Sequence, residues 1–194
     1  MHELDYSNLE RSLIDVIKEE QAKLGYYRED IRLYYPLSSL NHFFGMDVNA
    51  DKMQKILEGT REDADATRNI VEGMNARLSD KLGMVEVSHR GDRFCFHIPP
   101  EGVEYVHENT KENEFIRELV NLVAKHGCTI DQIYELFTAH SDRVGREKMD
   151  NGEFDERIWF QDDADDPYYY CFKQEGGHMI YHRFLPEDYE DFEF

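Results

Sequence analysis

Two histidines near the end of the chain are of the residue type that binds metals. His178 and His182 are separated by three residues in the segment HMIYHRF, and imidazole nitrogen is a common zinc ligand. On a helix this spacing would place both rings on one face. On a β-strand, which rises about 3.3 Å per residue, they lie roughly 13 Å apart and cannot share one ion. The surrounding residues are typical of a strand, so the sequence favours two polar histidines on an edge strand over a metal site.

The rest of the chain contains no pattern that a catalytic or cofactor site requires. The three cysteines, Cys95, Cys128 and Cys171, form no CxxC pair, which argues against a zinc site or a disulfide framework. There is no P-loop, no GxGxxG and no GxSxG motif. We therefore assign no catalytic residue, no cofactor and no metal, and expect a protein that is not an enzyme. An uncharacterised hydrolase or metal enzyme stays as a third hypothesis, because missing motifs are weak evidence.

The charge of the chain is strongly acidic. There are 42 Asp and Glu residues against 22 Lys and Arg residues, a formal net charge of -20, which opposes binding to a phosphate backbone. The densest acidic runs are Asp162, Asp163, Asp165 and Asp166, and residues 187–194 (EDYEDFEF). Such clusters repel nucleic acid and attract basic protein surfaces, although they also occur as solvated loops and tails. The charge favours a basic protein as the partner.

Two groups of residues are suited to binding. His89, Arg90 and Arg93 surround Gly91 in a polar turn, where they could contact phosphates or a partner, or simply form a hairpin turn. Tyrosines also occur in two doublets and a triplet, and because neighbouring strand residues point to opposite faces, some of these rings must meet solvent or an interface. The tyrosines are Tyr26, Tyr27, Tyr34, Tyr35, Tyr168, Tyr169 and Tyr170.

Hydrophobic periodicity predicts the elements that position these residues. Helices are expected over residues 7–24, 37–44, 51–58 and 63–82, with a short strand at 31–35, and a capping box of Ser7 and Glu10 starts the first helix. The period then changes to two over residues 85–98, which predicts a half-buried hairpin with its turn at 89–92. Pro99 and Pro100 end the second strand, and a helix resumes near Glu101.

This order resembles the winged-helix domains of MarR-type and PadR-type bacterial regulators over residues 24–106. The resemblance rests on Leu82, Gly83, the alternation from Val85 to Ile98, and Pro100, Glu101 and Gly102. It implies that the hairpin is a wing and that either residues 51–58 or residues 63–82 form a recognition helix.

The second half of the chain is expected to form a separate acidic α+β domain. Helices are predicted at 112–125 and 130–139, the latter capped by Thr129 and Gln132, followed by strands at 157–161, 168–173 and 178–184. The predicted fold is therefore α+β, with a winged-helix-like domain over residues 1–108 and a second domain over residues 109–194. The second domain is either two helices with a small antiparallel sheet or a second, degenerate winged helix.

As a whole, the chain resembles a family of uncharacterised proteins from anaerobic gut bacteria. The resemblance rests on the segments IKEEQAKLGY, IRLYYPLSSL and GDRFCFHIPPEGVEYV, and it implies no activity. We expect a non-enzymatic interaction or regulatory module on a winged-helix scaffold, whose acidic surface binds a basic partner. The alternative is a DNA-binding transcriptional regulator that uses residues 85–98 as its wing. No apolar run is long enough to span a membrane and no secretory signal is recognisable, so a cytoplasmic location is expected.

Overall fold

The computed structural model describes residues 4–59 and 72–190. The chain divides into two compact units, unit 1 (Met1–Glu112) and unit 2 (Asn113–Phe194), where the sequence predicts a boundary at residue 108. Over the described residues there are eight helices and two antiparallel sheets, so the predicted α+β class is confirmed. No helix within these residues is long and apolar enough to cross a membrane.

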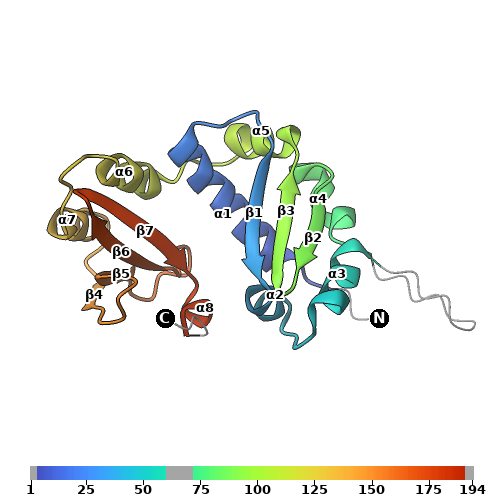
Figure 1. The fold of residues 1–194 in the computed structure, drawn as a ribbon. Coiled ribbons are helices and arrows are strands. Elements are labelled where there is room, and N and C mark those ends of the chain that lie inside the picture. The colour runs from blue at the N-terminus through green and yellow to red at the C-terminus, as the bar shows by residue number, and fades with distance from the viewer. Residues whose placement is uncertain (1–3, 60–71, 191–194) are drawn as a thin grey trace, which may run out of the picture. The chain divides into compact units, whose positions relative to one another are not determined.

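Unit 1 combines five helices with a three-stranded sheet in the part of it that the structure describes (Figure 1). Its elements are α1 (Ser7–Leu24), β1 (Ile31–Pro36), α2 (Leu37–Phe44), α3 (Ala50–Glu58), α4 (Asn75–Leu82), β2 (Glu86–Arg90), β3 (Arg93–Ile98) and α5 (Pro100–Asn109). The strand order is β1-β3-β2, with both pairs antiparallel. The hairpin predicted over residues 85–98 is therefore confirmed.

One face of this sheet forms the core of unit 1. Side chains alternate along β3, so that Phe94, Phe96 and Ile98 are fully buried while Arg93 on the other face is exposed. Helix α1 contributes three fully buried residues at helical spacing, Leu9, Leu13 and Ile17, as an amphipathic helix does. The alternating pattern of the sequence thus separates an inner, apolar face of the sheet from an outer, polar one.

The outer face carries a histidine held between two carboxylates. His97 Nε2 lies 2.7 Å from Asp30 Oδ2, and His97 Nδ1 lies 3.4 Å from Glu86 Oε2. The hydrogen bond with Asp30, followed by that with Glu86, raises the pKa of His97 above its ordinary value of 6.5. Because the folded pKa is the higher one, the protonated ring stabilises the fold fully below pH 6.5, and this contribution is lost as the pH rises through the folded pKa.

We therefore expect thermal stability to fall above pH 6.5 in a way that depends on His97. His97→Gln should flatten this part of the profile of melting temperature against pH, and Asp30→Asn should flatten it similarly because it removes the main partner. The measurement is the melting temperature of both variants and the original protein across neutral pH, followed by circular dichroism. Equal slopes in the original protein and in His97→Gln would show that this ion pair does not contribute to stability.

Two sequence predictions for the helices of unit 1 need correction. The capping box of Ser7 and Glu10 does not form, because α1 already begins at Ser7 and its N-cap is Tyr6; the Asp5 carboxylate instead accepts the Ser7 N–H at 2.9 Å. The helix predicted over residues 63–82 begins only at Asn75, and the predicted residues 63–71 lie outside the described range. The start of α4 lies beside the end of α3, since the Met74 N–H donates to the Leu57 carbonyl at 2.8 Å.

Unit 2 has two helices followed by a four-stranded meander and a short final helix over its described residues (Figure 1). Its elements are α6 (Glu114–Val123), α7 (Ile130–His140), β4 (Val144–Lys148), β5 (Glu156–Phe160), β6 (Tyr169–Glu175), β7 (His178–Phe184) and α8 (Pro186–Glu190). The strand order is β4-β5-β6-β7. This order does not repeat that of unit 1, so of the two alternatives the structure has helices with an antiparallel sheet rather than a second winged helix.

Aromatic rings fill the core of unit 2. Phe137 on α7 has its ring centroid 4.7 Å from that of Phe115 on α6, 4.9 Å from Phe160 on β5 and 5.2 Å from Tyr170 on β6. The predicted capping box at the start of α7 is confirmed, with both the Thr129 and the Gln132 side chains bonded to backbone. One face of the sheet therefore packs on α6 and α7, which leaves its other face for the pocket described next.

Candidate functional site

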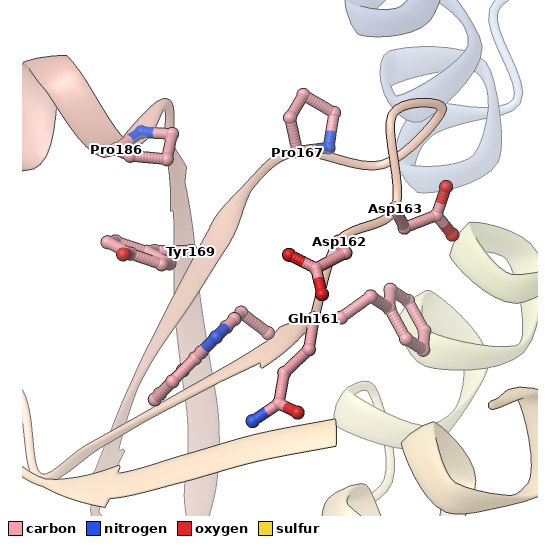
Figure 2. A pocket seen from close by; sticks show the side chains of 8 residues that line it. Gln161, Asp162, Asp163, Pro167, Tyr169 and Pro186 are labelled. Atoms are coloured by element: carbon pink, nitrogen blue, oxygen red, sulfur yellow. The ribbon is translucent and has the colours of Figure 1, made fainter. Parts of the chain in front are cut away.

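A pocket of about 400 Å³ lies in unit 2 at the end of β5, the start of β6 and the start of α8 (Figure 2). Aromatic rings, two prolines and two carboxylates line it together, and we call it the acidic-aromatic pocket. The lining residues are Trp159, Phe160, Gln161, Asp162, Asp163, Pro167, Tyr169 and Pro186.

The aromatic wall results from strand alternation and from a glycine on the neighbouring strand. Ile158 and Phe160 are buried against the helices, so Trp159 between them points to the opposite face. Trp159 pairs with Gly145 on β4, where a Cβ atom would lie 2.2 Å from the indole ring. Gly145 thus gives the indole room to lie across β4. The ring centroids of Trp159 and Tyr169 are 5.5 Å apart, in an edge-to-face arrangement.

The same rings already bind a cation that belongs to the chain itself. The guanidinium of Arg157 lies 5.2 Å from the centroid of Trp159, 4.6 Å from that of Tyr169 and 4.8 Å from that of Tyr189 on α8. Its Nε also donates to Glu147 Oε2 at 2.8 Å. A cation over an aromatic face is attracted by the ring quadrupole. This aromatic group is therefore arranged to hold positive charge.

The carboxylates come from the loop between β5 and β6. Asp162 is the one described non-glycine residue with positive φ, at 56°, a conformation that Asp tolerates better than most residues. Its side chain is 74 % exposed and forms an ion pair with Arg143. In Figure 2 the Asp162 carboxylate points toward the side where Tyr169 and Pro186 lie, whereas Asp163 points the other way. The loop thus places exposed negative charge beside the rings.

The groups around this face are not arranged for nucleophilic chemistry. Cys171, which pairs with Arg157 across β5 and β6, is fully buried, and burial raises the pKa of its thiol to about 12. Burial also raises the pKa of Tyr189. Both groups therefore stay protonated near neutral pH, and a thiol in this state is a poor nucleophile. Neither group is therefore an activated nucleophile.

His178 and His182, the two candidate metal ligands, contact different side chains. His178 packs against the ring of His126 at a centroid distance of 5.1 Å, whereas His182 contacts Phe154 and Phe184. Both belong to strand β7, as the strand interpretation requires. Within the described ranges, no group of three or more His, Cys, Asp or Glu residues is placed to hold a metal ion.

The residues of the predicted basic turn separate onto two faces of the sheet. Arg90 and Arg93 pair directly across the β2-β3 turn and are both exposed. His89 turns inward instead, where its ring stacks on Phe94 at 5.1 Å and its Nε2 lies 3.4 Å from Asp51 Oδ1. The structure therefore brings the two arginines together, while the ring of His89 packs against Phe94.

The turn itself does not project as a free wing. The Asp92 carbonyl accepts the Leu37 N–H at 2.7 Å, which ties the turn to the start of α2. Strand β1 also pairs with β3 along its whole length, as far as Arg93, the first residue of β3, which pairs with Pro36. The arginines consequently lie on the outer face of the three-stranded sheet.

The predicted interface tyrosines divide into exposed and buried rings. Tyr26, Tyr27 and Tyr34 are 45 %, 42 % and 55 % exposed. Tyr35 and Tyr170 are core residues, 7 % and 0 % exposed, so their assignment as interface aromatics is wrong. Both point to the apolar face of their sheet, where each hydroxyl finds a partner, Tyr35 with Ser12 at 3.0 Å and Tyr170 with Asp166 at 2.7 Å.

The remaining two tyrosines of the triplet contact arginines. Tyr169 belongs to the acidic-aromatic pocket, and Tyr168 is half-buried with the guanidinium of Arg183 4.3 Å from its ring centroid. Sequence reasoning missed Trp159, Pro167 and Pro186 as pocket residues. The available signal was the segment RIWFQDD, in which strand alternation puts Arg157 and Trp159 on one face just before two carboxylates.

Comparison with known proteins gives a family and no activity. No curated protein and no solved structure matches the chain. The family model described as "Domain of unknown function, E. rectale Gene description (DUF3877)" matches residues 6–193, in agreement with the resemblance to a family of unknown function from gut anaerobes. The chain therefore belongs to the DUF3877 family.

Proposed function

We propose that this protein is a non-enzymatic interaction module that binds a basic segment of a partner protein in the acidic-aromatic pocket. One observation carries the proposal: the pocket combines the rings of Trp159 and Tyr169 with the carboxylate of Asp162, and Asp163 adds a second negative charge at its edge. Aromatic rings and carboxylates together recognise lysine and arginine side chains. That Arg157 already lies over the same rings supports this specificity.

The affinity of such a site follows from its individual cation–ring contacts and ion pairs. A cation over an exposed ring contributes about 0.5–1 kcal/mol, and an exposed ion pair contributes about 0–1 kcal/mol. One side chain therefore binds weakly, and a useful affinity requires several basic residues of a partner. The net charge of -20 favours this by raising the rate of encounter with a basic protein, an effect that salt screens.

A winged-helix scaffold for unit 1 is part of this proposal. Its element order, with β1 between α1 and α2 and the β2-β3 hairpin before α5, supports it, as does the strand order β1-β3-β2. A scaffold of this kind does not by itself imply DNA binding, because function resides in the site and not in the fold.

The DNA-binding alternative has less support. The β2-β3 turn is tied to α2 and does not project toward a groove. The exposed charges of α3 also balance, with Asp51 and Glu58 against Lys52 and Lys55, whereas a recognition helix works in a phosphate field that favours positive charge.

The indole of Trp159 provides a direct test, because it is the only tryptophan of the chain. We expect a lysine-serine repeat peptide to change the intrinsic tryptophan fluorescence, and a glutamate-serine repeat peptide to leave it unchanged. Replacing both Asp162 and Asp163 by Asn should weaken binding by about fivefold to tenfold, as loss of two exposed ion pairs implies. Binding should also weaken as salt is raised.

The matched control is the double variant Asp150→Asn and Glu153→Gln, which removes the same charge from exposed positions of unit 2 outside the pocket. It should bind the lysine peptide nearly as the original protein does. Equal weakening in both double variants would reduce the effect to net charge and refute a specific pocket. No binding of the lysine peptide at low salt would refute the proposed function.

A further inference from the structure

The outer face of the unit 1 sheet carries positive charge on a strongly acidic chain. Strand alternation exposes Arg32 and Tyr34 on β1, Arg93 on β3 and Arg90 on β2 on this face. Arg93 lies directly opposite Arg90 in the antiparallel register. Like charges directly opposite one another on neighbouring strands destabilise a sheet, so the stability of the hairpin does not explain this pair.

Arg90 and Arg93 form no ion pair within the chain segments that the structure describes, whereas Arg32 interacts electrostatically with Asp30. The ion pairs there include Arg28, Arg143, Arg146 and Arg157, but none involves Arg32, Arg90 or Arg93. The chain has 42 acidic residues against 22 basic ones, so carboxylates are abundant. Arg90 and Arg93 are left available for an anion from outside.

The side chain of Arg93 is oriented before any ligand binds. Its guanidinium lies 4.8 Å from the centroid of the Tyr34 ring, and stacking on a ring leaves the in-plane N–H groups free to donate. Ser88, in register with Cys95 next to this pair, adds a hydroxyl. A planar guanidinium held in this way matches the two oxygens of a carboxylate or phosphate.

A depression of about 500 Å³ lies over these residues. We call it the outer arginine pocket, and none of its lining residues is acidic. The lining residues are Tyr34, Ser88, His89, Arg90, Arg93 and Cys95.

The nearby carboxylates are already engaged or lie at the edge of this region. At the other end of the face, Asp30 and Glu86 contact His97. Asp51 contacts His89, and Asp92 belongs to the turn between the two arginines. An incoming anion would therefore meet the two guanidinium groups without a carboxylate in the pocket lining.

We propose that the outer arginine pocket binds an acidic segment of a partner protein, with a carboxylate or phosphate oxyanion held between Arg90 and Arg93. The proposal does not depend on the function proposed above, because it concerns the other unit and a ligand of opposite charge. An acidic peptide and a phosphorylated peptide both present an oxyanion on a flexible chain. The β2-β3 turn is bonded to the start of α2 and does not project, which favours a flexible chain over a DNA groove as the ligand.

The experiment measures fluorescence anisotropy of two labelled peptides, a glutamate-serine repeat and a serine peptide with phosphoserines. We expect at least one of them to bind the protein in a salt-sensitive way. The double variant Arg90→Gln and Arg93→Gln should weaken binding by about tenfold, the effect of losing two charge-assisted contacts on an exposed surface. Tyr34→Leu should weaken it less, because it removes the orientation of Arg93 but keeps its charge. The stronger peptide identifies the source of the oxyanion.

The matched control is Arg11→Gln with Lys18→Gln, which removes two positive charges from α1 and should leave the affinity close to that of the original protein. Circular dichroism of each variant checks that the fold is retained. Equal affinity in the Arg90→Gln and Arg93→Gln variant and in the control variant would overturn the proposal. Two further results would overturn it. If the Arg90→Gln and Arg93→Gln variant kept peptide binding but lost binding to duplex DNA, DNA would be the ligand. If it kept peptide binding but lost self-association, a second copy of the chain would be the ligand.

Discussion

Replacing Phe137 by alanine is expected to destabilise unit 2 by about 3–5 kcal/mol, the usual cost of truncating a buried phenylalanine. Phe137 is fully buried, and its ring contacts aromatic side chains from one helix and two strands. Edge-to-face pairs, such as those of Phe137 with Phe115 and Tyr170, contribute beyond the buried area alone. Its loss would leave a cavity at the point where α6, α7 and the sheet meet.

The measurement is urea unfolding followed by the fluorescence of Trp159, which lies in unit 2 and is the only tryptophan. The signal therefore reports the unfolding of unit 2. Glu135→Ala is the control, since it changes an exposed residue on the same helix and should alter stability by no more than about 0.5 kcal/mol. A Phe137→Ala midpoint close to that of the control would contradict the packing described for the core.

The period of the hydrophobic pattern explains which strands could be predicted. Residues 93–98 alternate strictly between buried and less buried positions, because one face packs on helices and the other is polar, so their sequence shows the period of two. Strand β4, VGREK, has one buried residue, Gly145, and glycine carries no hydrophobic signal. This strand is held by pairing with β5, an interaction that its own sequence does not show, and the sequence analysis missed it.

The candidate site was only partly predictable for a related reason. Alternation indicates that neighbouring tyrosines point to opposite faces, but it does not say which face is the core, and Tyr35 and Tyr170 proved to be the buried members. The acidic run at 162–166 was recognised from its composition. Its proximity to Trp159 and Pro186 depends on the β5-β6 connection and on α8, and such long-range contacts follow from topology rather than from local pattern.

Gly102→Ala should destabilise unit 1 by about 1–3 kcal/mol, although alanine is ordinarily the better helix former. Gly102 lies in the first turns of α5 and is buried. A Cβ atom at this position would lie 2.2 Å from the Leu82 carbonyl oxygen and 2.7 Å from the Leu82 carbonyl carbon. These are backbone atoms at the end of α4, which cannot rotate away as a side chain can. Overpacking of this kind costs about 1–3 kcal/mol and sometimes more, which exceeds the roughly 1 kcal/mol by which alanine is favoured over glycine in a helix.

Hydrogen exchange of unit 1 amides is the suitable measurement, because the only tryptophan lies in unit 2. Peptides from α4 and α5 should lose protection in Gly102→Ala, since the two helices must move apart to admit a methyl group. Glu101→Ala, one residue earlier and exposed, introduces alanine in the same turn without the clash and should leave protection nearly unchanged. Increased protection in Gly102→Ala would mean that helix propensity outweighs contact with Leu82, and hence that α5 does not pack on α4 as closely as described. Because α4 leads directly into β2 and α5 follows β3, loss of this contact would also loosen the hairpin that presents Arg90 and Arg93.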